Sequence, residues 1–268
     1  MRLKLAALFL MLALTMMISI YAVIQCIPEP QEPEEPYEYE NMVPPAAVIT
    51  PDPAPVPESS EQDVPLEDEI PQVVPPVVFL PDHNALHTQN KDYIGWLQID
   101  GTDINLPVVQ GKDNSYYLKH TFSKKYSSYG CPFLDTRTPP GSDCLVIHGH
   151  NMGYNRTEVF SSLVYFEDPQ YAQEHSVLRF LQPDGEGDLY TLFAVLNVDI
   201  KDPASNYIIS SFETEDDRLQ FLSKLQSESL YPSDDIPSSG QILILSTCNR
   251  RYGEDNRLLI VALQNVEF

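Results

Sequence analysis

The sequence predicts a mainly β globular domain, an eight-stranded barrel with a few added α-helices, preceded by a transmembrane helix and a disordered linker. Three observations predict this organisation: an uncharged apolar run near the N-terminus, a long segment rich in Pro and Glu, and a C-terminal region of short aliphatic runs separated by turn residues. The predicted parts are residues 1–26 (cytoplasmic tip and membrane anchor), 27–82 (extracellular linker) and 83–268 (globular domain).

The apolar run is long enough to cross a membrane. Residues 5–24 carry no charge, and twenty helical residues rise about 30 Å, the thickness of the hydrocarbon core. Arg2 and Lys4 precede the run, so the positive-inside rule places the N-terminus in the cytoplasm and the rest of the chain outside. Two alternatives are a cleaved signal peptide, although no A-x-A site follows, and a lipoprotein cysteine at Cys26, although Gln25 is not small.

The second part, residues 27–82, has the composition of a spacer. Most of the 24 prolines of the chain lie in it, in stretches such as "PEPQEPEEPYEYE". Proline removes backbone donors and like charges repel, so no packed core is expected here. At about 3.1 Å per residue in polyproline II, some fifty residues could reach about 150 Å and hold a globular unit away from the membrane. A proline-rich ligand for another domain is the alternative.

Charge and cysteine content exclude several classes of function. The 268 residues include 16 basic and 39 acidic side chains, a net charge of −23, which argues against nucleic acid or an anionic membrane surface as partner. No CxxC pair exists among the four cysteines, so no thiolate zinc site is indicated. Cys131 and Cys144 are expected on two strands of one hairpin, too far apart to form a disulfide, so we interpret all four cysteines, Cys26 and Cys248 included, as free thiols.

The globular part contains eight strand-like runs and two predicted helices. Turn signals such as Asp100-Gly101 and Pro139-Pro140-Gly141 separate the runs. Helices are expected over residues 157–166 and 213–230, the second with Thr214 as its N-cap and acidic residues in its first turn. Many strands with few helices favour a closed or nearly closed barrel. The eight runs are "WLQID", "INLPVVQ", "CPFLD", "CLVIHGH", "VLRFLQ", "LYTLFAVLNVDI", "QILILSTC" and "RLLIVALQNV".

Cys248 closes one of the buried-looking runs, at the point where a loop begins. Free cysteine is among the most buried residue types, so a merely packed Cys248 is one interpretation. The other is a nucleophile, because a thiolate attacks an amide carbonyl and a nearby imidazolium or guanidinium increases the thiolate fraction of a cysteine.

Two histidines follow another apolar run, in "CLVIHGHNMGYN". Gly149 allows a tight turn that exposes a histidine at the strand end, where it could act as a general acid. A lone histidine is more often a surface residue or a satisfied core residue. The pair His148 and His150 could also ligate a metal, but no third cluster of ligands accompanies it, so no metal is predicted.

Arg257 begins the last strand-like run. If residues 242–248 and 257–264 pair as antiparallel neighbours, Arg257 and Cys248 lie at the same end of the barrel. A guanidinium there can donate two hydrogen bonds to a carbonyl oxygen and never loses its charge. A surface ion pair with a neighbouring acidic residue, Glu254 or Asp255, is the alternative role.

In combination these residues resemble the class B sortases, membrane-anchored cysteine transpeptidases of Gram-positive bacteria. The resemblance spans residues 93–264 and rests on "GWLQIDGTDINLPVVQGKDNSYYL", "GCPFLDTR", "VIHGHNMGYNRTEVF", "SNYIISSF" and "LSTC…R". It implies a sortase-type barrel as catalytic domain, with no required cofactor. It also implies that Cys248 is the nucleophile, His150 the essential histidine and Arg257 the essential arginine, with His148 in the wall of the site.

The resemblance further implies a substrate and a reaction. The enzyme would cleave a C-terminal sorting motif of a secreted protein after Thr, often of the NPxTx type, hold it as a thioester, and pass it to an amine of a cell wall precursor or a pilin lysine. A secreted cysteine peptidase ending in hydrolysis and a non-catalytic wall-spanning adhesion module are the alternatives. The residues that fall on peptide-contacting positions or beside the nucleophile are Asn114, Leu118, Tyr207, Ile208, Ser246 and Thr247.

Overall fold

The computed structural model describes residues 81–153, 155–183, 188–233, 236–237 and 239–265. The predicted transmembrane helix and nearly all of the predicted linker lie outside the described residues. Among the residues that are described, no helix combines the length and the apolar character needed to cross a membrane.

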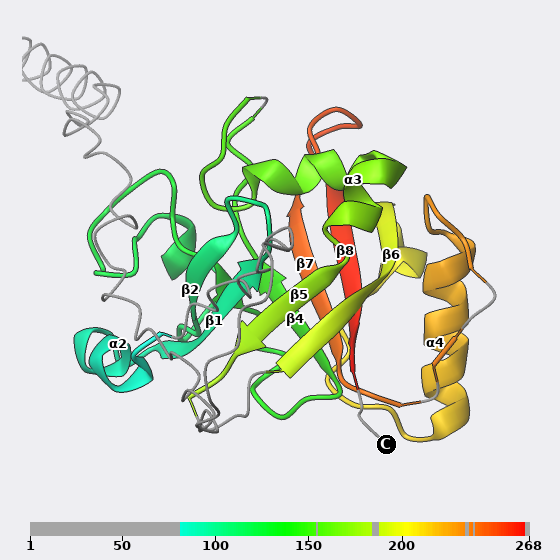
Figure 1. Cartoon of the computed structure of the whole chain (residues 1–268), viewed down its shortest axis with the longest axis horizontal. Helices are drawn as coiled ribbons and strands as arrows, with labels where there is room; N and C mark the ends of the chain where they lie inside the picture. Colours follow the sequence, from blue (N-terminus) through cyan, green and yellow to red (C-terminus); the bar gives the residue numbers. More distant parts are fainter. Residues whose placement is uncertain (1–80, 154, 184–187, 234–235, 238, 266–268) are drawn as a thin grey trace, which may run out of the picture. The chain divides into compact units, whose positions relative to one another are not determined.

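Eight strands form a closed barrel in the spatial order β1-β2-β3-β4-β7-β8-β6-β5, which confirms the predicted eight-stranded barrel (Figure 1). Neighbours are antiparallel except for β2 with β3 and β4 with β7, which run parallel. All eight predicted runs are strands in the structure. Their bounds are β1 Tyr93–Ile99, β2 Asn105–Val109, β3 Phe133–Leu134, β4 Cys144–His148, β5 Val177–Leu181, β6 Asp188–Asp199, β7 Ile242–Cys248 and β8 Asn256–Gln264.

The strands that carry the site are buried on both faces, which explains their continuous aliphatic sequences. In β7 every residue from Ile242 to Thr247 is buried, and Cys248 is the first that is not. One face packs into the barrel, and the other packs under α4, whose Phe221, Leu222 and Leu225 belong to the same apolar cluster as residues of β4, β6, β7 and β8. Buried aliphatic residues at successive positions hold the strand ends in place.

Helix α4, Glu215–Ser227, confirms the second predicted helix and its N-cap. The Thr214 hydroxyl accepts a hydrogen bond from the Asp217 amide, and the Asp217 carboxylate accepts from the Thr214 amide in return, a complete capping box.

The other predicted helix, 157–166, is displaced and shorter. A 3-10 helix, η3, spans Ser161–Glu167, and a separate helix, α3, spans Pro169–Glu174. Val159 has a φ of 55°, which no α-helix continues through, so the helical segment cannot begin before it. Asp168 then caps α3, which has Pro169 in its first turn, and a new helix starts. The sequence analysis also missed the remaining short helices: α2 His83–Gln89, η2 Tyr116–Leu118 and η4 Pro203–Ser205.

None of the cysteines that the structure describes forms a disulfide, as expected. Cys131 and Cys144 are 2 % and 0 % exposed, and burial raises the pKa of the Cys144 thiol to about 12. Cys248 is the partly exposed one of the three. Thus two thiols are buried and inert, and one is accessible.

Candidate active site

One groove of about 590 Å³ opens at the end of the barrel where β4 and β7 finish and β8 begins. Segments 114–118 and 200–208 form its other walls. The structure brings every residue predicted to act in catalysis or peptide binding to this groove. They are Asn114, Leu118, His150, Tyr207, Ile208, Ser246, Thr247, Cys248 and Arg257.

Cys248 and Arg257 are brought together by strand pairing. They face each other across the antiparallel β7–β8 ladder, where the Cβ atoms of directly opposed residues lie about 5 Å apart. Both side chains therefore leave the same face of the sheet, and both line the groove. The predicted pairing of residues 242–248 with 257–264 is confirmed, and the partial exposure of Cys248 contradicts its alternative role as a packed core residue.

The turn that carries the histidines is fastened to the end of β7. The Asn151 side-chain amide donates to the Cys248 carbonyl at 3.0 Å, and the Thr247 hydroxyl donates to the Gly149 carbonyl at 2.7 Å. A Cβ on Gly149 would lie 2.5 Å from the ring of Phe160. The glycine is therefore needed because an aromatic ring packs against the backbone; its φ is not among the positive ones.

His150 is oriented by a backbone carbonyl. Its Nε2 lies 2.8 Å from the carbonyl oxygen of Leu118, in the short helix η2. A carbonyl oxygen only accepts, so Nε2 carries a proton in this contact, and Nδ1 is the nitrogen left for proton exchange with other groups. Leu118 thus contacts the catalytic histidine candidate through its main chain.

Arg257 is held through one nitrogen of its guanidinium. Nη1 donates to the carbonyl oxygens of Glu254 at 3.0 Å and Asn256 at 2.9 Å. Among the described residues, Nε and Nη2 have no hydrogen-bond partner and no carboxylate forms an ion pair with Arg257, while Asp255 pairs with Lys201. The alternative role in a surface ion pair is therefore wrong, and the free edge can still donate two hydrogen bonds to one oxygen.

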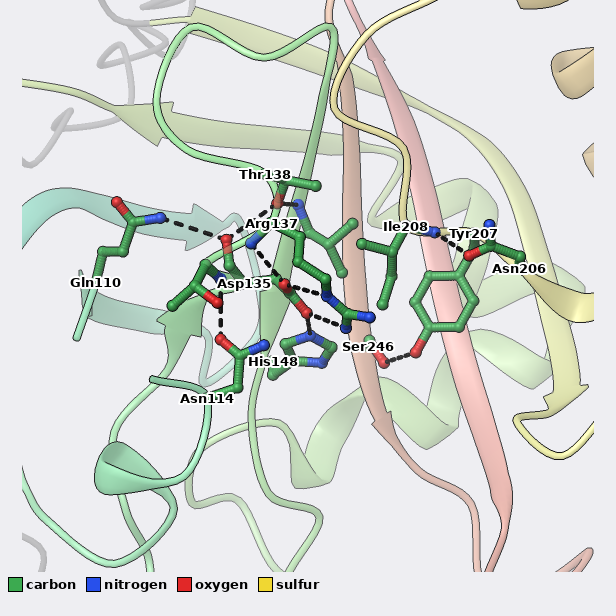
Figure 2. Close-up of polar contacts among 12 residues, drawn as sticks. Gln110, Asn114, Asp135, Arg137, Thr138, His148, Asn206, Tyr207, Ile208 and Ser246 are labelled. Carbon is green, nitrogen blue, oxygen red and sulfur yellow. Dashed lines mark hydrogen bonds and ion pairs between the residues drawn. The ribbon is translucent and has the colours of Figure 1, made fainter. Parts of the chain in front are cut away.

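A buried carboxylate, which the sequence analysis did not single out, organises the groove beside Ser246 (Figure 2). The Asp135 side chain is fully buried and accepts from Arg137 Nε at 2.9 Å, Arg137 Nη2 at 2.7 Å and His148 Nε2 at 2.9 Å. Burial raises the pKa of Asp135, but the hydrogen bonds from Arg137 and His148 outweigh burial and hold its pKa well below the ordinary range. His148 is thus engaged with a carboxylate at the wall of the groove.

The predicted peptide-contacting residues differ in how freely they face the groove. The Asn114 side-chain carbonyl accepts from the Thr136 amide at 2.9 Å, which ties segment 114–118 to the end of β3. The Tyr207 hydroxyl lies 3.0 Å from the Ser246 hydroxyl, and burial raises the pKa of Tyr207. Ser246 and Thr247 are each 1 % exposed, so their side chains present little surface to a ligand.

Sequence reasoning missed several residues that line the groove, chiefly Asp135, Arg137 and the turn Asp202–Pro203. The available signal was the run "PFLDTR", in which an acidic and a basic residue follow two apolar ones within three positions. Because a charge is costly to bury without a partner, such a pattern indicates a paired carboxylate. In the part of the chain that the structure covers, no group of three His, Cys, Asp or Glu side chains is arranged to hold a metal.

Comparisons with known proteins agree with the fold. A family model described as the sortase domain matches residues 97–265. The chain therefore belongs to the sortase family.

The similar proteins place the chain in class B of that family. Sortase B of Staphylococcus aureus is 30 % identical over 190 residues, covering 70 % of this chain and 75 % of that protein. Sortase B of Listeria monocytogenes is 30 % identical over 179 residues, covering 66 % and 70 %. The crystal structure of Clostridium perfringens sortase B superposes with a TM-score of 0.62 at 30 % identity, covering 68 % of this chain and 99 % of that one. A sortase B–substrate complex from Staphylococcus aureus gives 0.61 at 29 %, covering 68 % and 84 %. The chain is a class B sortase, a cysteine transpeptidase.

Proposed function

We propose that Cys248 is the nucleophile, His150 the general acid and base, and Arg257 the stabiliser of the oxyanion. The observation that carries the proposal is the composition of the groove. It is lined by an accessible thiol, by an imidazole that Leu118 orients and by a guanidinium with a free edge.

The chemistry follows from these three groups. The Cys248 thiolate attacks the carbonyl carbon of the scissile peptide, and the carbonyl oxygen takes up negative charge. The free Nε and Nη2 edge of Arg257 donates to that oxygen, as donors placed in advance at a developing charge do. His150 donates a proton to the leaving amine, the C–N bond breaks and a thioester to Cys248 remains. An incoming amine, deprotonated by His150, then attacks the thioester and releases the Cys248 thiolate.

The substrate we propose is a C-terminal sorting motif of a secreted protein, cleaved after Thr, with an NPxTx-like sequence or a related one. Asn114, Leu118, Tyr207, Ile208, Ser246 and Thr247 are proposed to form the peptide-binding site, because all six line the groove. Ser246 and Thr247 are almost fully buried, so they would contribute little exposed side-chain surface to it. The proposed acceptor is an amine of a cell wall precursor or a pilin lysine. No cofactor takes part in these steps.

The proposed location is the outer face of the cell membrane. Residues 5–24 would anchor the chain with its N-terminus in the cytoplasm, and residues 27–82 would act as the extracellular spacer that carries the catalytic domain, residues 83–268. The uncharged run, the basic residues before it and the Pro- and Glu-rich composition after it support this arrangement.

The reaction can be tested with a library of peptides that carry sorting-type motifs and a set of amines, among them a lysine side chain and short peptide amines. The chain is expected to give products in which the fragment ending in Thr is joined to the amine, detected by mass. If only hydrolysed peptide forms at saturating amine, the chain acts as a peptidase and the transfer step is wrong.

A further inference from the structure

A polar network that takes no part in the chemistry proposed above lies under the loop that follows the nucleophile. Glu167, the last residue of η3, has a side chain that is only 15 % exposed. Its Oε1 accepts hydrogen bonds from the side-chain amides of Asn197 at 2.8 Å and Asn249 at 2.9 Å, and Asn249 also donates to Asn197 at 2.7 Å. The network therefore joins η3, β6 and the residue directly after Cys248 around one carboxylate.

The same carboxylate reaches a second point of the loop. Its Oε2 lies 3.6 Å from Nη1 of Arg251, two residues beyond Asn249. Figure 1 shows η3 and α3 lying across the end of the barrel from which the loop between β7 and β8 leaves. Because Asn249 is 3 % exposed, its side-chain amide is satisfied by Glu167 and Asn197 rather than by water. These contacts fix the start of the loop to η3 and β6.

The loop between β7 and β8 supports Arg257. The two ends of this loop are joined, because the main-chain amide of Asn249 donates to the Asn256 carbonyl at 3.0 Å. The Asn256 side chain also donates to the Tyr252 carbonyl at 2.9 Å. The carbonyls of Glu254 and Asn256 are the two acceptors that hold Nη1 of Arg257. Any displacement of the loop therefore moves those acceptors, and the guanidinium moves with them.

We propose that Glu167 is a positioning residue for the reaction: acting through Asn249 and Arg251, it holds the loop that aims the guanidinium of Arg257 at the oxyanion. This inference rests on the proposed catalytic role of Arg257. Donors placed in advance lose effect steeply when they shift, and a displacement of about 1 Å can lower a rate by about 100-fold. Glu167 itself touches neither substrate nor nucleophile, so its removal affects kcat and leaves KM nearly unchanged.

The test is a double-mutant cycle with Glu167→Ala and Arg257→Ala, with transpeptidation measured on the full chain by mass-detected product. Glu167→Ala is expected to lower kcat by about 10- to 100-fold, with KM within twofold of the parent. In the Arg257→Ala background the same change is expected to lower the residual kcat by less than twofold, because there is no guanidinium left to aim. Glu167→Gln, which keeps an oxygen for both asparagine amides, is expected to recover most of the activity.

The matched control is Glu174→Ala, in the exposed part of the neighbouring helix α3, which is expected to leave kcat unchanged. An equal loss from Glu167→Ala in both backgrounds would overturn the inference, because Glu167 would then act independently of Arg257. Parent-like turnover in Arg257→Ala alone would instead refute the proposed role of Arg257. If Glu167→Ala does not fold, Asn249→Ala replaces it in the same cycle, with the same expected non-additivity and the same refuting result.

Discussion

Asp135 supplies a prediction whose magnitude follows from its contacts. Its buried carboxylate accepts hydrogen bonds from the main-chain amide of Arg137, from the Arg137 guanidinium and from His148. In Asp135→Asn the amide offers one acceptor in place of two and turns a donor toward these donors. Arg137 is 62 % exposed and recovers water. Most of the cost therefore comes from the imidazole of His148, which loses its acceptor, and from the main-chain amide, whose acceptor loses its charge. At about 1–2 kcal/mol for each of these two losses, the expected loss of unfolding free energy is about 2–4 kcal/mol.

The assay is thermal and denaturant unfolding of the purified chain. A loss of about 3 kcal/mol corresponds to a fall in Tm of about 6–12 °C for a domain of this size. The matched control is Asp103→Asn, an exposed carboxylate on the loop between β1 and β2, which is expected to change Tm by less than about 1 °C.

The pH dependence of this difference has a definite sign. The folded chain lowers the pKa of Asp135, so the carboxylate contributes stability that is fully present above the ordinary Asp pKa of about 3.9 and is lost as the pH falls toward the folded-state pKa. The difference in unfolding free energy between the parent and Asp135→Asn should therefore be largest above about pH 5 and shrink below about pH 4. A difference that stays constant with pH, or that is no larger than the one for the Asp103→Asn control, would contradict this prediction.

Two further predictions concern the histidines and the cap of α4. His150→Ala should abolish turnover with little change in Tm, whereas His148→Ala should keep measurable turnover; the opposite order in steady-state assays would show that the two histidines are assigned to the wrong roles. Thr214→Ala removes the hydroxyl that caps α4 and should lower the unfolding free energy by about 1 kcal/mol, visible as a Tm fall of about 2–4 °C; an unchanged Tm would mean that the capping box contributes nothing in this context.

The strands could be predicted from sequence because each is a short run rich in aliphatic and aromatic residues that lies between turn signals. β7 and β8 are buried on both faces, and this is the pattern that local sequence records most clearly. Helix α4 was found through its N-cap and acidic first turn, both of which are local signals. The displaced start of η3 could not be found in this way, because it depends on the positive φ of Val159, a β-branched residue that rarely adopts it.

The site residues that lie at strand ends could be predicted from sequence. Those whose roles depend on tertiary contacts could not. Cys248 and Arg257 are cross-strand partners, so the predicted pairing of their two strands was enough to place them at the same end of the barrel. The roles of Asp135 and Glu167 depend on partners far away in the chain, His148 for the first and Asn249 for the second. The local sequence indicates a paired carboxylate at Asp135, but nothing local identifies His148 or Asn249 as partners, because polar networks of this kind are assembled by the fold.

The most direct test of the central claim is the intact mass of the chain after it is mixed with a sorting-type peptide. We expect a mass increase equal to the peptide fragment that ends in Thr, located on Cys248 and absent from Cys248→Ala. Addition of an amine should remove this increase and form the joined product. If the parent chain turns over peptide while no adduct forms on Cys248, or if Cys248→Ala retains turnover with its fold intact, the groove at the end of the barrel is not used in the way described.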